Sequence, residues 1–352
     1  MPCWYNKKIY NTKYIIKKTI VYFWNVKLKN KNILITGGAG FIGSNLVDYF
    51  IENKNKVTVL DNLLTGKEEN ISHHFNNKDF TYIKGDIRDF EICQKAVAQK
   101  DFVFHQAALG SVPRSINDPI TTNEININGF LNMLTASRNA KVERFIYAAS
   151  SSTYGDSKQL PKLEDNIGKP LSPYAITKYV NELYANVFSN LYKMEVIGLR
   201  YFNVFGKRQD PEGAYAAAIP LFIKLLIDGN KPTINGDGSA TRDFTYIKNV
   251  VQMNELAALT KKEDALNQVY NVAYGENINL NKLISLLKNN LSNYDKTILN
   301  IEAIYGPERI GDIHDSLASI EKAKKLLGYN PKYSVEKGLE EAIDWYWKYF
   351  NK

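Results

Sequence analysis

A tyrosine and a lysine, Tyr174 and Lys178, stand four residues apart at the start of a predicted helix that runs through Asn190. One helical turn places both side chains on the same face. A free tyrosine, whose pKa is about 10, is a weak base at neutral pH. A nearby ammonium stabilises the phenolate, and Ser150 can donate or accept a proton beside it. Such a group suits removal of a hydroxyl proton while hydride leaves the same carbon.

Tyrosine–lysine pairs are also common on exposed helix surfaces, so this chemistry requires a hydride acceptor nearby. The chain offers a place for one. An apolar run, Ile33–Ile35, is followed by Gly37, Gly40 and Gly43 and then by an amphipathic helix over residues 45–51. A strand, a glycine turn and a helix N-terminus form a site for a pyrophosphate, because backbone N–H groups point outward and no Cβ blocks the approach.

A glycine pattern alone also fits a tight turn, but an acid further along the chain favours a dinucleotide. The apolar run 57–60 ends at Asp61, at about the 20-residue distance expected of the carboxylate that binds an adenosine ribose. Asn62 rather than an arginine follows it, and a carboxylate at this place repels a 2′-phosphate. The sequence therefore predicts NAD rather than NADP.

Strands and helices alternate along the first two thirds of the chain, which predicts an α/β fold with a doubly wound, Rossmann-type parallel sheet. His105 ends one strand and is interpreted as a packed histidine, not a base. The carboxyl ends of the strands share one edge of such a sheet, where ligands bind. The residues expected at that edge are Gly37, Asp61, Asp86, Gln106 and Ser150.

We divide the chain into three parts. Residues 1–31 form a basic extension, which we expect to be helical. Residues 32–200 form the NAD-binding domain, to which 244–275 return a helix and a strand. Residues 201–352, where glycine, proline and asparagine interrupt the alternation, form a smaller α/β substrate-capping domain.

Composition excludes several classes of protein. The chain has 352 residues, 44% of them hydrophobic and 23% charged, which is ordinary for a globular protein. Its net charge is +8, and residues 1–31 hold eight lysines and no acid, so the remainder is close to neutral (8 − 8). The neutral body disfavours a nucleic-acid partner.

The extension is too short in apolar residues to span a bilayer and carries no small-residue cleavage site. We expect a helix packed on the body or across a dimer, with weak contact to a membrane surface as the alternative. Cys3 and Cys93 have no metal-binding or disulfide spacing. We therefore expect no metal ion and a cytoplasmic location.

Taken together, these motifs resemble the extended short-chain dehydrogenase/reductase family, and within it the nucleotide-sugar 4-epimerases. The resemblance covers the chain from about residue 31 to its end. The segments that carry it are Thr36–Gly43, Asp61–Asn62, Gly85–Arg88, Ser150–Gly155, Tyr174–Lys178 and Arg200–Gly206.

The resemblance implies NAD as cofactor and three sets of site residues. The catalytic set is Tyr174, Lys178, Ser150 and Ser151. The cofactor set is Gly37, Gly40, Phe41, Ile42, Gly43, Asp61, Asn62, Gly66, Asp86, Ile87, Gln106, Ala107, Ala108, Tyr174 and Lys178. The substrate set is Gly110, Ser111, Arg114, Ser150, Ser151, Asn203, Arg242, Arg309, Asp312 and Ser316.

The substrate is expected to be a UDP-sugar, epimerised at C4 through a 4-keto intermediate in the synthesis of surface polysaccharide precursors. Relatives that dehydrate the sugar carry acids where Ser151 and Ser152 stand. The small Ser316 leaves room for an acetamido group, which favours UDP-GlcNAc and UDP-GalNAc. UDP-glucose/UDP-galactose and UDP-hexuronates remain alternatives, followed by a nucleotide-sugar reductase or dehydratase. The resemblance also implies a homodimer built from helices 121–139 and 174–190.

Overall fold

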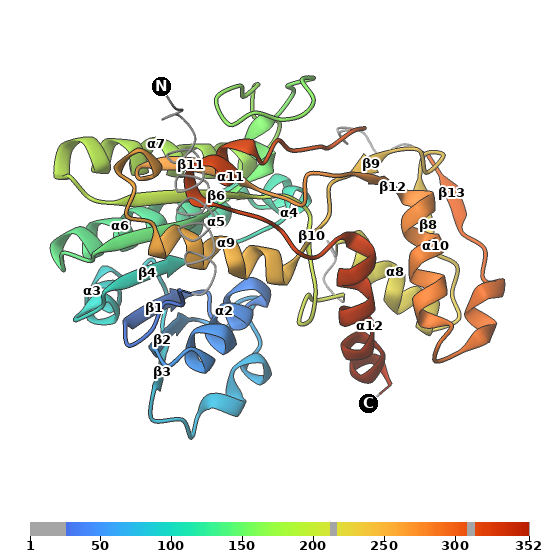
Figure 1. Ribbon diagram of the computed structural model, residues 1–352, viewed down its shortest axis with the longest axis horizontal. Helices are drawn as coiled ribbons and strands as arrows, with labels where there is room; N and C mark the ends of the chain where they lie inside the picture. The colour runs from blue at the N-terminus through green and yellow to red at the C-terminus, as the bar shows by residue number, and fades with distance from the viewer. Residues whose placement is uncertain (1–25, 212–216, 308–313, 352) are drawn as a thin grey trace, which may run out of the picture.

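A parallel sheet of seven strands dominates the computed structural model, which describes residues 26–211, 217–307 and 314–351 (Figure 1). The order across the sheet is β11-β6-β5-β4-β1-β2-β3, and every neighbouring pair is parallel. The predicted Rossmann-type fold is confirmed. The strands are β1 (Asn32–Thr36), β2 (Lys56–Asp61), β3 (Phe80–Lys84), β4 (Phe102–His105), β5 (Arg144–Ser150), β6 (Val196–Tyr201) and β11 (Gln268–Val272).

Helices cover both faces of this sheet. In β1, Ile33 and Ile35 pack into one hydrophobic cluster, whereas Leu34 packs into another on the opposite face. This division explains the uninterrupted apolar run, because alternate residues of a strand point to opposite faces. The first face is covered by α2 (Phe41–Glu52), α9 (Ile247–Leu259) and α11 (Glu321–Leu327), and the second by α3 (Phe90–Val97), α6 (Phe130–Asn139) and α7 (Pro173–Tyr192).

Local signals set where the site-bearing helices begin. The hydroxyl of Ser172 accepts a hydrogen bond from the backbone N–H of Ala175 at 3.1 Å, and Pro173 occupies the first turn of α7. Both residues favour a helix start because they satisfy or remove unpaired N–H groups. The carboxylate of Asp89 caps α3 in the same way.

The helix predicted over 121–139 is present, and its middle is π-helical. The structure has α4 (Val112–Asn117), α5 (Pro119–Asn123), a π-helical segment (Glu124–Gly129) and then α6. A π segment widens one turn and turns side chains away from their α-helical directions. Here it presents Asn126, whose amide oxygen accepts from the N–H of Leu109 at 2.7 Å.

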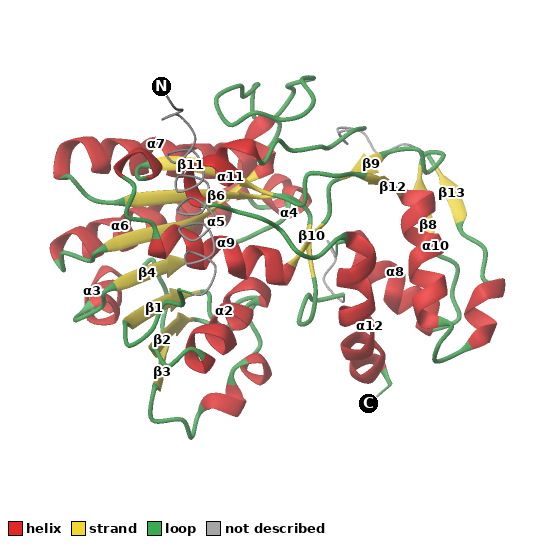
Figure 2. Ribbon diagram, in the orientation of Figure 1, coloured by secondary structure: helices red, strands yellow, loops and turns green. Residues whose placement is uncertain are grey.

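The remaining elements form a smaller part on the right of Figure 1, beside the carboxyl edge of the sheet. Three short two-stranded ladders lie there beside helices (Figure 2). The strands are β7 (Val204–Phe205), β8 (Thr233–Asn235), β9 (Thr241–Arg242), β10 (Thr245–Tyr246), β12 (Ile278–Asn279) and β13 (Ile304–Gly306), and the helices are α8 (Ala218–Ile227), α10 (Leu280–Leu291) and α12 (Val335–Phe350).

Of the basic extension, residues 26–31 are described, and these six form no helix. The backbone N–H of Leu28 instead donates to the Glu255 carboxylate at 3.1 Å, and Lys27 forms an ion pair with the same group at 3.3 Å. The expected helix over residues 1–25 lies outside the described residues. Within the described residues, no helix is long and apolar enough to cross a membrane.

Candidate active site

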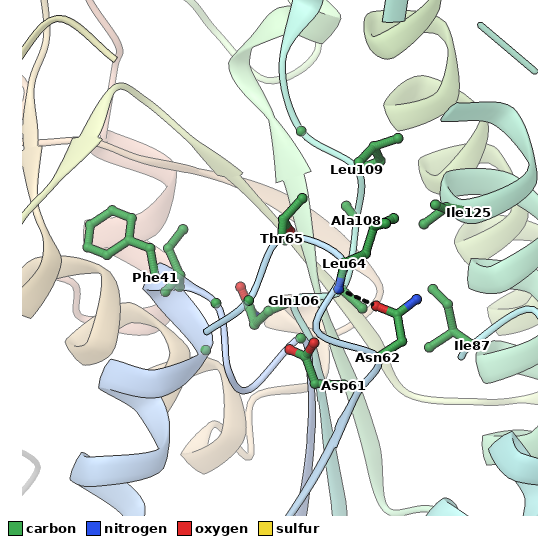
Figure 3. Close-up of a pocket in the computed structure, with 18 of the residues that line it drawn as sticks. Phe41, Asp61, Asn62, Leu64, Thr65, Ile87, Gln106, Ala108, Leu109 and Ile125 are labelled. Carbon is green, nitrogen blue, oxygen red and sulfur yellow. Dashed lines mark hydrogen bonds between the residues drawn. The ribbon is translucent and has the colours of Figure 1, made fainter. Parts of the chain in front are cut away.

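A pocket opens at the carboxyl edge of the sheet, at the place that the strand ends predict (Figure 3). Strand register brings its walls together, because Thr36 pairs with His105 and Ser150 pairs with Tyr201. The turns after β1, β2 and β4 therefore meet the ends of β5 and β6.

The glycine-rich turn is packed so closely that side chains are excluded from it. A Cβ on Gly43 would lie 2.1 Å from the carbonyl oxygen of Gly37, and one on Gly37 would lie 2.7 Å from the N of Ala107. Gly40 is the N-cap residue of α2, which is described in full. The helix therefore begins without a side-chain cap, and its first turn contains no acidic residue. The start of α2, where Phe41, Ile42 and Gly43 line the pocket, therefore suits a pyrophosphate.

Two acids line the wall beside this turn. The carboxylate of Asp61 accepts from the backbone N–H of Ala39 at 2.9 Å and of Leu63 at 2.8 Å, while burial raises its pKa. The Asn62 amide donates to Asp86 at 2.9 Å, and the Arg88 guanidinium holds the pKa of that carboxyl below its usual range. Figure 3 shows Asn62 also accepting from the N–H of Leu64.

The predicted catalytic side chains converge on the same pocket. Tyr174 and Ser150 both line it, and the Ser150 hydroxyl lowers the pKa of the Tyr174 phenol. The ammonium of Lys178 donates to the carbonyl of Ala148 at 2.8 Å and lies 5.9 Å from the centre of the Tyr174 ring. The hydroxyl of Ser150 also accepts from that of Ser152 at 2.9 Å. These contacts fix the tyrosine at the end of β5.

The electrostatics of the tyrosine differ from the sequence-based expectation. Burial raises the pKa of Tyr174, and the Ser150 hydroxyl lowers it by less. Burial also lowers the pKa of Lys178 to about 8, against the pull of the Glu182 carboxylate. A low dielectric penalises both charged forms. The lysine alone therefore does not make this phenol acidic.

Sequence reasoning missed three residues that organise the pocket. The Tyr201 hydroxyl donates to the Gln106 side chain at 3.0 Å and accepts from the Asn254 amide at 3.0 Å. Asn126 joins the loop after β4 to α7, because its amide donates to the Thr177 hydroxyl at 3.1 Å. Tyr201 follows Arg200 in a segment that the sequence does mark, whereas Asn126 and Asn254 stand inside helices with no local signal.

His105 is packed, as interpreted from the sequence. Its Nδ1 lies 2.9 Å from the Thr36 hydroxyl, and its ring stacks on Phe145. Burial lowers its pKa to about 3, so the imidazole is neutral at physiological pH.

The structure brings all residues of the predicted cofactor set to this pocket, and Gly110 and Ser150 of the substrate set with them. The other described members of the substrate set lie outside its lining. Ser111 begins α4 with a φ of 96°. Arg309 and Asp312 lie outside the described residues. The members outside the lining are Ser111, Arg114, Ser151, Asn203, Arg242 and Ser316.

Asp48, His73 and His74 lie together at the surface, and their side chains are of the types that bind metal ions. The Nε2 atoms of His73 and His74 each lie 2.9 Å from one oxygen of Asp48. Arg208 and Lys207 bind the other oxygen at 2.9 and 3.1 Å. Two cations already compensate this carboxylate, and the trio does not line the cofactor pocket.

Comparison with known proteins identifies the family. The model of the NAD dependent epimerase/dehydratase family matches residues 33–273. The chain belongs to this family. The predicted class, a nucleotide-sugar 4-epimerase of the extended short-chain dehydrogenase/reductase type that uses NAD, is confirmed.

Three solved epimerases share the whole fold. A UDP-N-acetylglucosamine 4-epimerase from Methanobrevibacter ruminantium, in complex with UDP-N-acetylmuramic acid, is 39% identical with a TM-score of 0.84, covering 91% of this chain and 99% of that one. A UDP-glucose 4-epimerase from Thermotoga maritima is 38% identical, with a TM-score of 0.82 and coverage of 90% and 99%. A UDP-glucuronic acid 4-epimerase from Bacillus cereus, solved with NAD, is 32% identical, with a TM-score of 0.82 and coverage of 90% and 99%.

The residues present fit NAD on physical grounds. The uncapped first turn of α2 offers donors to a diphosphate, and the Asp61 carboxylate at the end of β2 is the acceptor that ribose hydroxyls need. No arginine stands directly after Asp61 to bind a 2′-phosphate.

Proposed function

We propose that this epimerase inverts C4 of a UDP-sugar, with UDP-GlcNAc and UDP-GalNAc as its preferred pair, in the synthesis of surface polysaccharide precursors. The observation that carries the reaction is that Tyr174, Ser150 and the buried Lys178 line one pocket together with a glycine-rich turn that suits NAD. A positioned proton acceptor next to a hydride acceptor is what alcohol oxidation at a sugar carbon requires.

NAD held by the start of α2 and by Asp61 would supply a reversible hydride acceptor for C4. Tyr174 takes the 4-hydroxyl proton as hydride leaves, and Ser150 holds the phenol and that hydroxyl in line. The ammonium of Lys178 stabilises the phenolate. The 4-keto sugar then turns over while its diphosphate stays bound. Tyr174 returns the proton as hydride arrives on the other face.

The residues around the serine favour epimerisation over dehydration. Elimination of water needs a further acid or base at the neighbouring carbon. Next to Ser150, the chain presents the hydroxyls of Ser151 and Ser152, and the Ser152 hydroxyl is engaged with Ser150.

The preference for an N-acetylated sugar rests on the segment around Ser316. This residue is partly buried, and its N–H donates to the carbonyl of Thr241 at 3.1 Å, so it lies beside the strand that carries Arg242. The guanidinium of Arg242 in turn donates to the carbonyl of His314 at 2.9 Å. We infer that residues 201–352 cap the substrate, that Arg242 binds the diphosphate and that the small Ser316 side chain admits an acetamido group.

The decisive experiment incubates the purified protein separately with UDP-GlcNAc, UDP-glucose and UDP-glucuronic acid and separates the C4 stereoisomers. We expect UDP-GalNAc from UDP-GlcNAc at the highest kcat/KM, without net formation of NADH. If UDP-glucose or UDP-glucuronic acid is converted fastest, that sugar is the preferred substrate and the proposal of UDP-GlcNAc is wrong. Accumulation of NADH or a stable keto product would instead indicate a reductase or dehydratase.

We also propose that the chain works as a cytoplasmic homodimer. One face of α7 exposes a row of apolar side chains, Ile176, Leu183, Val187 and Leu191, between 46% and 67% exposed. Ile120 at the start of α5 is 72% exposed. Their burial between two copies would form a helix bundle. Sedimentation of wild type and Leu183→Asp tests this, and a wild-type monomer would contradict it. Weak contact of residues 1–31 with a membrane surface stays a second proposal.

A further inference from the structure

A third ionisable residue stands on α7 one turn beyond the catalytic pair Tyr174 and Lys178. Tyr174, Lys178 and Glu182 follow one another at intervals of four residues, so they share one face of the helix. Lys178 is only 3% exposed and Glu182 only 8%. A buried carboxylate therefore stands directly beyond the lysine that the reaction uses.

An arginine from the neighbouring strand fixes this carboxylate. Arg200 on β6 donates from Nε to one oxygen of Glu182 at 2.9 Å and from Nη2 to the other at 2.7 Å. Its Nη1 donates to the carbonyl of Glu164 at 2.8 Å, and the guanidinium lies 4.8 Å from the centre of the Tyr154 ring. A bidentate pair of this kind holds the carboxylate in one position.

The other titratable groups packed around Lys178 are neutral at physiological pH. Burial, together with the charge of Lys178, lowers the pKa of His105 on β4 to about 3. Burial keeps the pKa of Tyr147 on β5 well above its usual value. Of the charged groups, Glu182 is the one that favours the ammonium form of Lys178.

We propose that Glu182, held by Arg200, is a positioning residue that keeps the buried Lys178 protonated and thereby sets the reactivity of Tyr174. The proposal rests on the proposed epimerase function. Without the Glu182 carboxylate, burial alone would set the pKa of Lys178. The ammonium would then be lost at lower pH, and the phenolate would form only at higher pH. Both changes narrow the pH range in which the pair can work.

The test removes both charges of the ion pair between Glu182 and Arg200, called the clamp below. Glu182→Gln alone leaves a buried guanidinium unpaired, which is costly to folding, so the informative protein is the double variant Glu182→Gln/Arg200→Gln. The chain offers a matched control at the opposite end of β5. The guanidinium of Arg144 there binds Glu195 at 2.9 Å and the carbonyl of Ala257 at 2.9 Å, away from the pocket. The control is therefore Arg144→Gln/Glu195→Gln.

Turnover of UDP-GlcNAc is measured against pH for the three proteins, together with binding of NAD and UDP. In the Glu182/Arg200 variant we expect the acid limb of the profile of turnover against pH to move to higher pH and the alkaline limb to move to lower pH. Turnover at neutral pH should fall by about tenfold, which is the effect of a change of one unit in pKa. Binding of NAD and UDP should be retained. The control pair should keep the wild-type profile. A wild-type profile in the Glu182/Arg200 variant, or the same change in the control, would overturn the proposal.

A second readout does not depend on turnover. Phenolate formation at Tyr174 is followed by ultraviolet difference spectra, from which the spectrum of Tyr174→Phe in the same background is subtracted. We expect its midpoint at higher pH in the Glu182/Arg200 variant than in wild type, and an unchanged midpoint would contradict the role of Glu182. Failure of wild type to convert any UDP-sugar would overturn the proposed function instead, and this titration would still test the clamp.

Discussion

The two ends of the active site are built differently. The cofactor end consists of turns that follow β1, β2, β3 and β4, joined by Tyr174 and Lys178 of α7, and every residue expected there lines one pocket. At the sugar end, the expected residues come from widely separated segments, and of those that the structure describes only Gly110 and Ser150 share that lining. Backbone groups and tight packing make the first end, whereas we propose that long side chains from the smaller part of the chain make the second. Substitutions should therefore act differently at the two ends.

The largest effect is expected between the two ends, at Tyr174→Phe. Removal of the phenolic oxygen should reduce turnover by roughly 10²–10⁴-fold, the usual contribution of a general acid–base. Binding of NAD and of UDP-sugar should change little, since both ends stay intact. Steady-state kinetics and equilibrium binding measure the two effects. Turnover within a few fold of wild type would remove Tyr174 from the reaction.

The next largest effect is expected at the cofactor end. Gly43→Ala would place a Cβ 2.1 Å from the Gly37 carbonyl, which forces the turn to move. We expect the loss of about 1–3 kcal/mol in stability or NAD affinity, as for overpacked sites. Gly306→Ala is the matched control, because its Cβ would meet the nearest atom at an ordinary 3.5 Å. Thermal unfolding with and without NAD compares the two, and equal behaviour would contradict the tight turn.

The sugar end should respond selectively. Ser316→Tyr should lower kcat/KM for UDP-GlcNAc relative to UDP-glucose by about tenfold or more, because a filled pocket rejects the larger substituent. Ser316→Ala should leave the ratio unchanged. Equal losses on both sugars would show that Ser316 does not select for the acetamido group.

The smallest effect concerns pH. Burial lowers the pKa of Lys178 to about 8, so the ammonium is lost as pH rises through that value, and turnover should fall by half near there. In the unfolded chain the lysine keeps its proton to about pH 10. Over this window the unfolded state binds more protons, so this group makes the fold more stable as pH rises. Lys178→Met should therefore lose turnover without loss of thermal stability, and an alkaline limb beginning only near pH 10 would contradict the shift.

Much of the fold was predictable because its signals are local. The apolar run Ile33–Ile35 and the glycines after it predict a buried strand and a phosphate-binding turn through periodicity and missing Cβ atoms alone. The helix predicted over 121–139 is present, but its π-helical middle was not predictable. The contact that this segment serves, between Asn126 and Leu109, joins residues that no local pattern connects.

The sequence by itself determined the chemical groups and their local spacing: the glycine-rich turn, Asp61, and Tyr174 one turn before Lys178. These follow from backbone geometry within a few residues. Only the tertiary structure decided how those groups behave. Burial raises the pKa of Tyr174, whereas the sequence alone predicts that the lysine lowers it. The ion pair between Glu182 and Arg200 forms only when β6 packs beside α7. Dielectric surroundings and contacts between distant segments exist only in the folded chain.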